Sequence, residues 1–302
     1  MKYTAENLII HSNSPADHGL INAVDPARAG WDYLHFESRG LAKGQSWSCA
    51  PGACEMALVV FSGALRAVSN HGEWPRIGQR ISVFAGLPEA LYLPLDSTLT
   101  VQALEDSQFA LAWAAAETMH PARLITQRDV TVEIRGGDNV TRQINGIIRP
   151  GFGCDRLVVV EVYTPSGNWS SYPPHKHDVH RVDASGRLLE ADLEEIYYYK
   201  VDQPEGYALQ HIYTGQTSPL EQAGQPIDAV LIARSDDLVL VPEGYHPVVS
   251  APGYTSYYLN ILAGSAQALT GEDDPQYAWV KETYTSRDPR VPIYPVDPGQ
   301  FI

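Results

Sequence analysis

Short apolar runs, each about the length of one β-strand and bounded by glycine, proline or aspartate, constrain the fold of this chain most strongly. Residues 56–68, 156–164 and 256–264 are examples, and they are rich in valine, isoleucine, leucine and tyrosine. These residues favour strands, and only short helical candidates lie between them. Many short strands separated by turns are typical of antiparallel sandwiches, barrels and jelly rolls. The sequence therefore predicts an all-β fold.

A faint internal repeat predicts two copies of one β-domain. Residues 89–101 and 236–248 share the same order of a strand, a proline, a short turn and a second strand. Two domains of about 150 residues each also suit a chain of 302 residues. We predict an N-terminal β-domain over residues 1–128 and a C-terminal β-domain over residues 129–302.

The most informative short motif is the histidine pair in the stretch PPHKHD. Successive side chains of a strand point to opposite faces, so His175 and His177 share one face and Lys176 takes the other. Two imidazoles about 6–7 Å apart along one strand can bind a single metal ion. Pro173 and Pro174 stiffen the chain before the pair.

Two further residues extend this pair to a set of four metal ligands. Glu195 opens the strand EEIYYYK, and His246 follows the turn Val-Pro-Glu-Gly, which has the residues of a type I turn. Three imidazoles and one carboxylate on adjacent strands suit a divalent transition metal. We predict a metal site made by His175, His177, Glu195 and His246. The ions expected there are Zn²⁺ or Mn²⁺, with Fe²⁺ or Ni²⁺ as alternatives.

An HxH pair, a later glutamate opening a strand and a distant histidine after a Pro-x-Gly turn are similar to the two-part metal signature of cupins. The stretches PPHKHD, LEEIYYYK, GYALQHIYT, DLVLVPEGYHPV and APGYTSYYLNILAG are more specific still. They resemble the 5-deoxy-glucuronate isomerase family of myo-inositol catabolism, which is related to the 4-deoxy-5-threo-hexosulose-uronate ketol-isomerases. The close resemblance covers about residues 144–264, and the N-terminal half fits the family's first cupin domain more loosely.

This resemblance implies a bicupin fold of two jelly-roll domains with a divalent metal in the second. It also implies conversion of 5-deoxy-D-glucuronate to 5-dehydro-2-deoxy-D-gluconate, an aldose–ketose isomerisation. A ketol-isomerase acting on another deoxy-uronate, a cupin dioxygenase and a storage or sugar-binding bicupin are the alternatives.

The first repeat lacks the metal motif. In our alignment of the repeats Glu55 takes the place of Glu195 and Thr98 that of His246, and no histidine pair precedes Glu55. One carboxylate cannot hold a metal ion, so we expect the N-terminal domain to be scaffold.

Other residues of the second repeat are candidates for substrate contacts. The strand pattern turns several side chains toward the expected pocket, and we take four of them as catalytic candidates: Tyr197, Tyr199, Gln210 and Tyr258. A substrate carboxylate needs a cation, because a guanidinium binds a carboxylate with two hydrogen bonds. The substrate-binding candidates are Arg142, Arg149, Arg181 and Asn260.

The charge balance excludes one large class of partners. Lys and Arg number 21 against 36 Asp and Glu, which gives a net charge of −15. Nucleic-acid binding needs an excess of cations, so we expect no such partner, and a small anionic sugar acid needs a local positive patch. The sequence shows neither a signal peptide nor a membrane-spanning run, so we expect a cytoplasmic protein with no membrane contact. Exposed edge strands would also allow a homo-oligomer.

Overall fold

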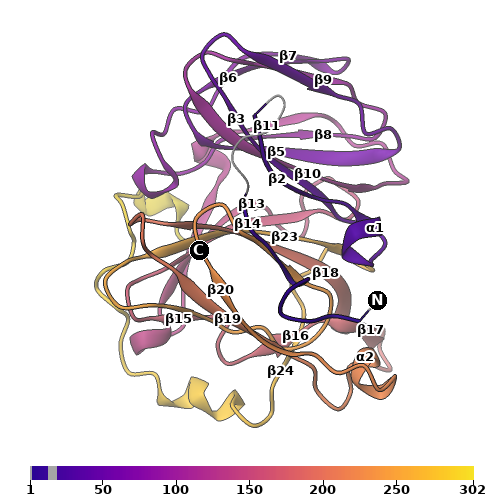
Figure 1. The fold of residues 1–302 in the computed structure, drawn as a ribbon, viewed down its shortest axis with the longest axis vertical. Helices are drawn as coiled ribbons and strands as arrows, with labels where there is room; N and C mark the ends of the chain where they lie inside the picture. Colours follow the sequence, from indigo (N-terminus) through magenta and orange to yellow (C-terminus); the bar gives the residue numbers. More distant parts are fainter. Residues whose placement is uncertain (1, 13–18) are drawn as a thin grey trace.

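The computed structural model describes residues 2–12 and 19–302, which form a stack of antiparallel β-sheets (Figure 1). In the first half, a six-stranded sheet runs in the order β11-β8-β5-β10-β3-β2 and a four-stranded sheet in the order β4-β9-β6-β7. Their bounds are β2 (Leu20–Val24), β3 (His35–Leu41), β4 (Ser46–Cys49), β5 (Cys54–Ser62), β6 (Leu65–Ser69), β7 (Gly72–Ile77), β8 (Ala90–Leu93), β9 (Leu99–Ala103), β10 (Ser107–Ala115) and β11 (Arg123–Ile125).

The second half repeats this plan with an eight-stranded sheet, in the order β1-β21-β18-β23-β14-β13-β12 with β17 paired to β18, and a four-stranded sheet, β15-β22-β19-β20. Strands β16 and β24 form a separate pair. The bounds are β1 (Ile9–Ile10), β12 (Thr131–Arg135), β13 (Arg142–Ile148), β14 (Val158–Thr164), β15 (Trp169–Ser170), β16 (His175–Lys176), β17 (Asp178–Val182), β18 (Leu188–Val201), β19 (Ala208–Tyr213), β20 (Asp228–Ala233), β21 (Leu238–Val241), β22 (Val248–Ser250), β23 (Ser256–Gly264) and β24 (Glu272–Asp273).

Helices contribute little to the described residues. They are the short α1 (Pro26–Ala29) and α2 (Pro219–Gln222), and the 3₁₀ turns η2 (Val83–Ala85), η3 (Gln127–Asp129), η4 (Asp138–Val140), η5 (Ala278–Thr283) and η6 (Pro298–Gln300). The predicted all-β class is therefore confirmed. None of the helices in the described ranges is long and apolar enough to cross a membrane.

Three apolar clusters hold the sheets together. One lies inside each half, and the third lies between the two large sheets and joins the halves. In this third cluster the ring of Phe61 stacks on the ring of Tyr198, with 5.1 Å between their centroids. Burial of apolar surface stabilises contacts by roughly 25 cal/mol per Å², so this shared cluster makes the halves one cooperative body.

Strand pairing crosses the predicted division between residues 128 and 129. Strand β1, which comes from the first 128 residues, pairs with β21 at the edge of the eight-stranded sheet. Apart from β1, the strands up to β11 pair only among themselves, and η3 lies between β11 and β12. The N-terminal segment thus reaches over to the second half, and the boundary itself stays a prediction.

Strand register corrects the alignment of the two repeats by one residue. Met56 pairs with Leu93 and Glu195 with Val241, and each partner directly precedes the turn proline. Met56 therefore occupies the position of Glu195, and Glu55 corresponds to Glu194. The expectation that Glu55 matches Glu195 was wrong, because two adjacent glutamates cannot be told apart without knowing which face each one takes.

Glu55 and Glu194 each bind backbone N–H groups of the other half of the molecule. Buried Glu55 accepts hydrogen bonds of 2.7–2.9 Å from the backbone N–H groups of residues 155–157. Glu194 accepts in the same way from the N–H groups of residues 32–34. A carboxylate satisfied by three N–H groups is a strong structural contact. Both glutamates thus act as scaffold, and in the first half the apolar Met56 fills the place of Glu195.

Candidate metal centre and substrate cavity

Three chain segments place predicted metal-ligand side chains inside the second β-sandwich. Glu195 lies on β18, His177 follows β16, and His246 follows the turn after β21. The turn needs Gly244, whose φ is +98° and whose Cβ would lie 2.5 Å from the carbonyl oxygen of Tyr213. The N–H of Gly244 donates to buried Asp178 at 2.7 Å, which ties this turn to the strand after the histidine pair.

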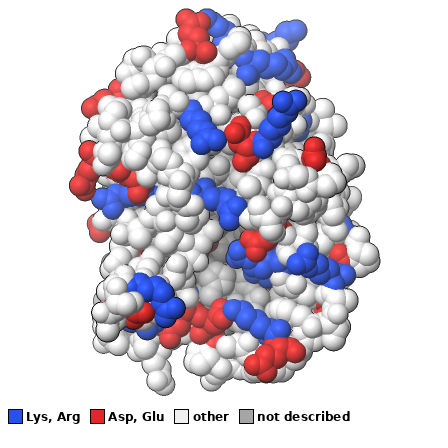
Figure 2. Space-filling model, turned by 180° about the vertical axis from the view of Figure 1, so that it is seen from behind, with Lys and Arg blue, Asp and Glu red and all other residues white. Residues whose placement is uncertain are grey.

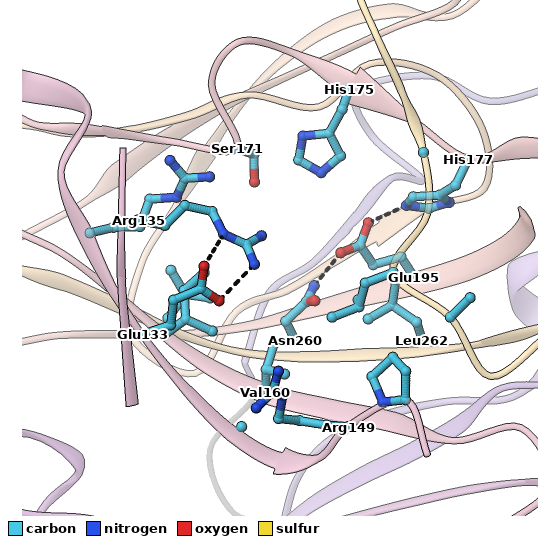
Figure 3. Close-up of a pocket in the computed structure, with 18 of the residues that line it drawn as sticks. Glu133, Arg135, Arg149, Val160, Ser171, His175, His177, Glu195, Asn260 and Leu262 are labelled. Carbon is cyan, nitrogen blue, oxygen red and sulfur yellow. Dashed lines mark hydrogen bonds and ion pairs between the residues drawn. The ribbon is translucent and has the colours of Figure 1, made fainter. Parts of the chain in front are cut away.

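His177, Glu195 and His246 form a compact buried group. Their ligand atoms all lie within 4.8 Å of one another, and Oε2 of Glu195 lies 2.7 Å from Nε2 of His177 and 3.1 Å from Nε2 of His246. The amide of Asn260 donates to the other carboxylate oxygen. Figure 3 shows this carboxylate between His177 and Asn260. Asn260 therefore fixes the orientation of Glu195.

Hydrogen bonds to the backbone set the direction of both imidazoles. Nδ1 of His177 lies 2.8 Å from the carbonyl oxygen of Leu193, and Nδ1 of His246 lies 2.8 Å from that of Gly244. A ring that donates from Nδ1 presents the lone pair of Nε2 to the group. Nε2 of His246 is buried without a hydrogen-bond partner. A bound cation would satisfy this buried nitrogen and the carboxylate of Glu195 together, so these residues fit a divalent metal ion.

The charges of the group are strongly coupled. Burial opposes ionisation of Glu195, but the nearby His246 and His177 outweigh it and lower the pKa of Glu195 to about 2. Burial lowers the pKa of His177, yet the charge of Glu195 and its hydrogen bond raise it overall. The carboxylate is therefore ionised at neutral pH, as a metal ligand must be.

His175 lies beside this compact group without belonging to it. Its ring meets that of His246 edge-on with 4.8 Å between the centroids, and Figure 3 shows it facing the same space as His177 and Glu195. Burial and the neighbouring His246 hold the pKa of His175 well below its ordinary value, so the imidazole is neutral. A neutral imidazole has a lone pair with which to bind a metal ion.

The group opens into a cavity of about 390 Å³. Strand β12, the start of β13 and the residue after β13 contribute charged residues to its wall, namely Glu133, Arg135, Arg142 and Arg149. Glu133 forms two hydrogen bonds with Arg135, of 3.0 and 2.8 Å (Figure 3). Although the chain carries a net charge of −15, basic side chains also border a hollow on the face in Figure 2. The cavity wall is positively charged and suits an anionic ligand.

The predicted catalytic tyrosines and glutamine separate into two layers. Tyr197 and Tyr258 line the cavity, and the hydroxyl of Tyr197 lies 3.2 Å from that of Ser171, which also lines it. Tyr199 and Gln210 are not among the lining residues. Instead, Tyr199 packs behind Tyr197 and Tyr258 and donates to Gln210 at 2.9 Å. Tyr199 and Gln210 therefore support the wall and do not face the cavity.

The predicted substrate-binding residues also differ in position. Asn260, Arg142 and Arg149 line the cavity. Arg181 lies outside it and contacts Glu190 and Glu272, at 3.4 and 3.1 Å. Arg181 belongs to the end of β17, where three consecutive residues are exposed, and this explains its position.

Glu243, in the turn that leads to His246, gives a pH-dependent prediction. Burial and then the charges of Asp178 and Asp192 raise the pKa of Glu243 to about 7. The unfolded chain releases this proton near pH 4.5, so stability falls as the pH rises from about 4.5 to about 7. We expect Glu243→Gln to raise the melting temperature above that of the wild type at pH 8 and to change it little at pH 4.5.

Thermal unfolding of both proteins at the two pH values tests this expectation. The exposed Glu205→Gln is the matched control, because it changes the net charge equally and should show no such pH-dependent gain. Equal melting temperatures of Glu243→Gln and the wild type at pH 8 would contradict it.

Comparison with known proteins identifies the family. The family model described as KduI/IolB family matches residues 8–280. The chain belongs to this family. A relative named 5-deoxy-glucuronate isomerase, from Geobacillus thermodenitrificans (strain NG80-2), is 40% identical over 276 residues, which are 91% of this chain and 96% of the relative. The protein of the same name from Bacillus subtilis (strain 168) is 34% identical, over 87% of this chain and 93% of the relative.

Solved structures show the same fold. The crystal structure of an IolB-like protein from Salmonella typhimurium LT2 has a TM-score of 0.82 and 34% identity, over 90% of this chain and 98% of that one. A single-residue variant of oxalate decarboxylase from Bacillus subtilis has a TM-score of 0.60 at 11% identity, over 93% of this chain and 87% of that one. The second likeness concerns the fold alone. Together they confirm the bicupin fold predicted for this KduI/IolB member.

Proposed function

We propose that this chain is a metal-dependent 5-deoxy-glucuronate isomerase, which converts 5-deoxy-D-glucuronate to 5-dehydro-2-deoxy-D-gluconate. The observation that carries the proposal is the buried His177, Glu195 and His246 group, which opens into a cavity with a basic wall. The proposal is supported by relatives of that name at up to 40% identity, aligned over nearly their whole length. The substrate is a small sugar acid, which the positive wall would attract.

We assign the metal site to His175, His177, Glu195 and His246. Their nitrogen and oxygen donors suit a divalent transition ion such as Zn²⁺ or Mn²⁺. When bound, such an ion supplies Lewis acidity to the carbonyl oxygen, where negative charge develops during isomerisation. The backbone bonds at Nδ1 and the amide of Asn260 keep the donor atoms in place before the ion binds.

The reaction transfers hydrogen between adjacent carbons and needs no external oxidant. The aldose gives up a proton from C2, the electron pair of that bond becomes part of an enediolate, and a proton is added at C1, so that C2 becomes the ketone. Burial raises the pKa of Tyr197 and Tyr258, so both hydroxyls stay protonated and can donate to substrate oxygens. The Tyr197 and Ser171 hydroxyl pair lies where it can contact the sugar.

Chelation gives the direct test of metal dependence. We expect purified enzyme to isomerise 5-deoxy-glucuronate, to lose most of its rate after dialysis against a chelator, and to regain it with Mn²⁺ or Zn²⁺. The reaction should run without oxygen and should consume none, because it is redox-neutral. Full activity of a protein with no bound metal would contradict the role of the ion, and oxygen uptake would point to a dioxygenase instead.

A further inference from the structure

Arg142, at the start of β13, is a buried cation without a counter-charge. Its exposed fraction is 7%, and no ion pair joins it to an acidic residue within residues 2–12 and 19–302. Its guanidinium makes one long hydrogen bond, 3.4 Å, to the carbonyl oxygen of Val140. Burial therefore lowers the pKa of Arg142. A buried charge with so little compensation is costly to the protein, and a ligand anion would remove this cost.

The other three arginines considered for the cavity are paired, partly exposed or outside it. Arg135 is paired with Glu133, and Arg149 is partly exposed and donates to the hydroxyl of Thr131 at 3.0 Å. Arg181 contacts Glu190 and Glu272 outside the cavity. Only Arg142, of these four described arginines, combines burial with the lack of a carboxylate partner.

Tyr284, from the C-terminal segment, adds a second unsatisfied donor at the same place. Its hydroxyl oxygen is buried without a hydrogen-bond partner, and burial raises the pKa of the hydroxyl, so it remains a donor. Arg142 and Tyr284 both line a second cavity of about 490 Å³, whose wall shares Arg135, Arg142 and His175 with the first. Arg142 and His175 thus lie where the two cavities meet, and Tyr284 lies on the wall of the second cavity.

The backbone beside this guanidinium leaves no room for a side chain. Gly136, which also lines the second cavity, has a φ of +81°, and a Cβ there would lie 3.0 Å from Nη1 of Arg142 and 2.3 Å from the carbonyl oxygen of Val140. A larger residue would push the guanidinium aside. Glycine therefore keeps Arg142 in position.

We propose that Arg142 and Tyr284 bind the carboxylate of the substrate and make the enzyme selective for sugar acids over neutral sugars. The guanidinium donates two hydrogen bonds to the carboxylate and the tyrosine hydroxyl donates a third. This inference rests on the proposed function for the identity of the acid. It assigns a role to Tyr284, which the sequence did not single out, and it selects Arg142 from the predicted arginines.

Kinetics on a charged and a neutral substrate tests the assignment. The pair is 5-deoxy-glucuronate and the 5-deoxy-hexose that has a hydroxymethyl group in place of the carboxylate. We expect Arg142→Gln to lower kcat/KM for the acid by about 10²- to 10³-fold and for the neutral sugar by less than about threefold. Tyr284→Phe should lower only the value for the acid, by about tenfold. Arg181→Gln, outside the cavity, is the matched control and should change neither.

Two measurements that do not depend on catalysis, ligand binding and thermal stability, test this inference independently of the proposed function. The unreactive acid made by reducing the aldehyde to an alcohol should bind the wild-type holoenzyme and bind Arg142→Gln about 10²-fold more weakly in calorimetry. Arg142→Met should raise the melting temperature of the ligand-free holoenzyme by about 2–4 °C, because it removes a buried charge. A merely structural arginine would give a decrease.

The outcomes are distinct. Three results would each overturn the assignment. In the first, Arg142→Gln lowers kcat/KM equally for the acid and the neutral sugar, and in the second, Arg149→Gln loses the selectivity and Arg142→Gln keeps it. In the third, Arg142→Gln binds the reduced acid as tightly as the wild type does. If the wild type binds the reduced acid through Arg142 but isomerises neither substrate, the carboxylate site stands and the proposed function fails. If the wild type isomerises the acid and Arg142→Gln does so equally well, the function stands and this inference fails.

Discussion

Replacing Glu195 with Gln is expected to lower kcat by at least about 10³-fold and to prevent metal binding at the proposed site. The neutral amide cannot balance the charge of a divalent ion, and the two Nε2 atoms that face position 195 would lose their anionic partner. Loss of an electrophilic stabiliser of this kind costs about 4 kcal/mol in the transition state, which corresponds to this factor. Metal content per chain and the steady-state rate of the purified variant measure both effects.

Glu194→Gln is the matched control at the neighbouring position. Glu194 faces the other half of the molecule and accepts hydrogen bonds from the backbone of residues 32–34, so its replacement should leave metal content and kcat within about twofold. It should lower the melting temperature, because an amide oxygen accepts these hydrogen bonds less strongly than a carboxylate. A Glu195→Gln variant with full metal content and normal kcat would rule out Glu195 as a ligand.

The sequence predicted the fold class because the relevant information is local. Alternation of side chains along a strand and punctuation by glycine and proline depend on neighbouring residues only. The same local rule placed Tyr197 with Glu195 on the cavity side of β18. It also placed Lys176 away from the site, where its ammonium group is fully buried and lies 2.7 Å from Glu190.

Register between distant strands could not be predicted in the same way. The strand that carries Glu194 and Glu195 runs from Leu188 to Val201, so the sequence did not show which residue faces β21 at the turn proline. A shift of one residue turns every side chain to the opposite face. This is why Glu55 was aligned with Glu195 and not with Glu194.

Residues that reach the site through tertiary contacts were missed for a related reason. Glu133 and Arg135 lie on an edge strand, and Tyr284 comes from the C-terminal segment, far along the chain from the metal motif. The only local signal was the spacing of Glu133 and Arg135, which are two residues apart and so share one face of a strand. Nothing in the sequence around Tyr284 indicates that its hydroxyl is buried beside a cation.

Replacing Arg80 with Met is expected to lower the free energy of unfolding by about 3–5 kcal/mol. Arg80 comes from the first half and Glu161 from β14 of the second, and Nη2 of Arg80 lies 2.5 Å from Oε1 of Glu161. The exposed fractions of the two side chains are 2% and 0%. Removal of the arginine leaves a buried carboxylate without its counter-charge, and urea titrations followed by tryptophan fluorescence measure the loss.

A second substitution separates the charge from the packing. Glu161 also accepts hydrogen bonds from Tyr257 at 2.9 Å and from Asn145 at 3.0 Å. The double variant Arg80→Met with Glu161→Gln removes the unpaired negative charge, and the amide oxygen of the introduced glutamine can still accept from one or both of these donors. The double variant should therefore be more stable than Arg80→Met alone, which gives a favourable coupling in the double-mutant cycle. If the free energy of unfolding of Arg80→Met alone is within about 1 kcal/mol of the wild-type value, loss of the arginine does not leave Glu161 as a costly unpaired charge, and this prediction is wrong.

The same contact links the interface to the site, because Val160 and Val162 flank Glu161 on β14 and line the cavity beside His177 and Glu195. A strand whose buried face loses its ion pair opens more easily, so amide exchange in β14 should accelerate in Arg80→Met more than exchange in the outer strands β6 and β7. If the two regions accelerate equally, the ion pair stabilises the whole molecule and has no particular effect on the cavity wall.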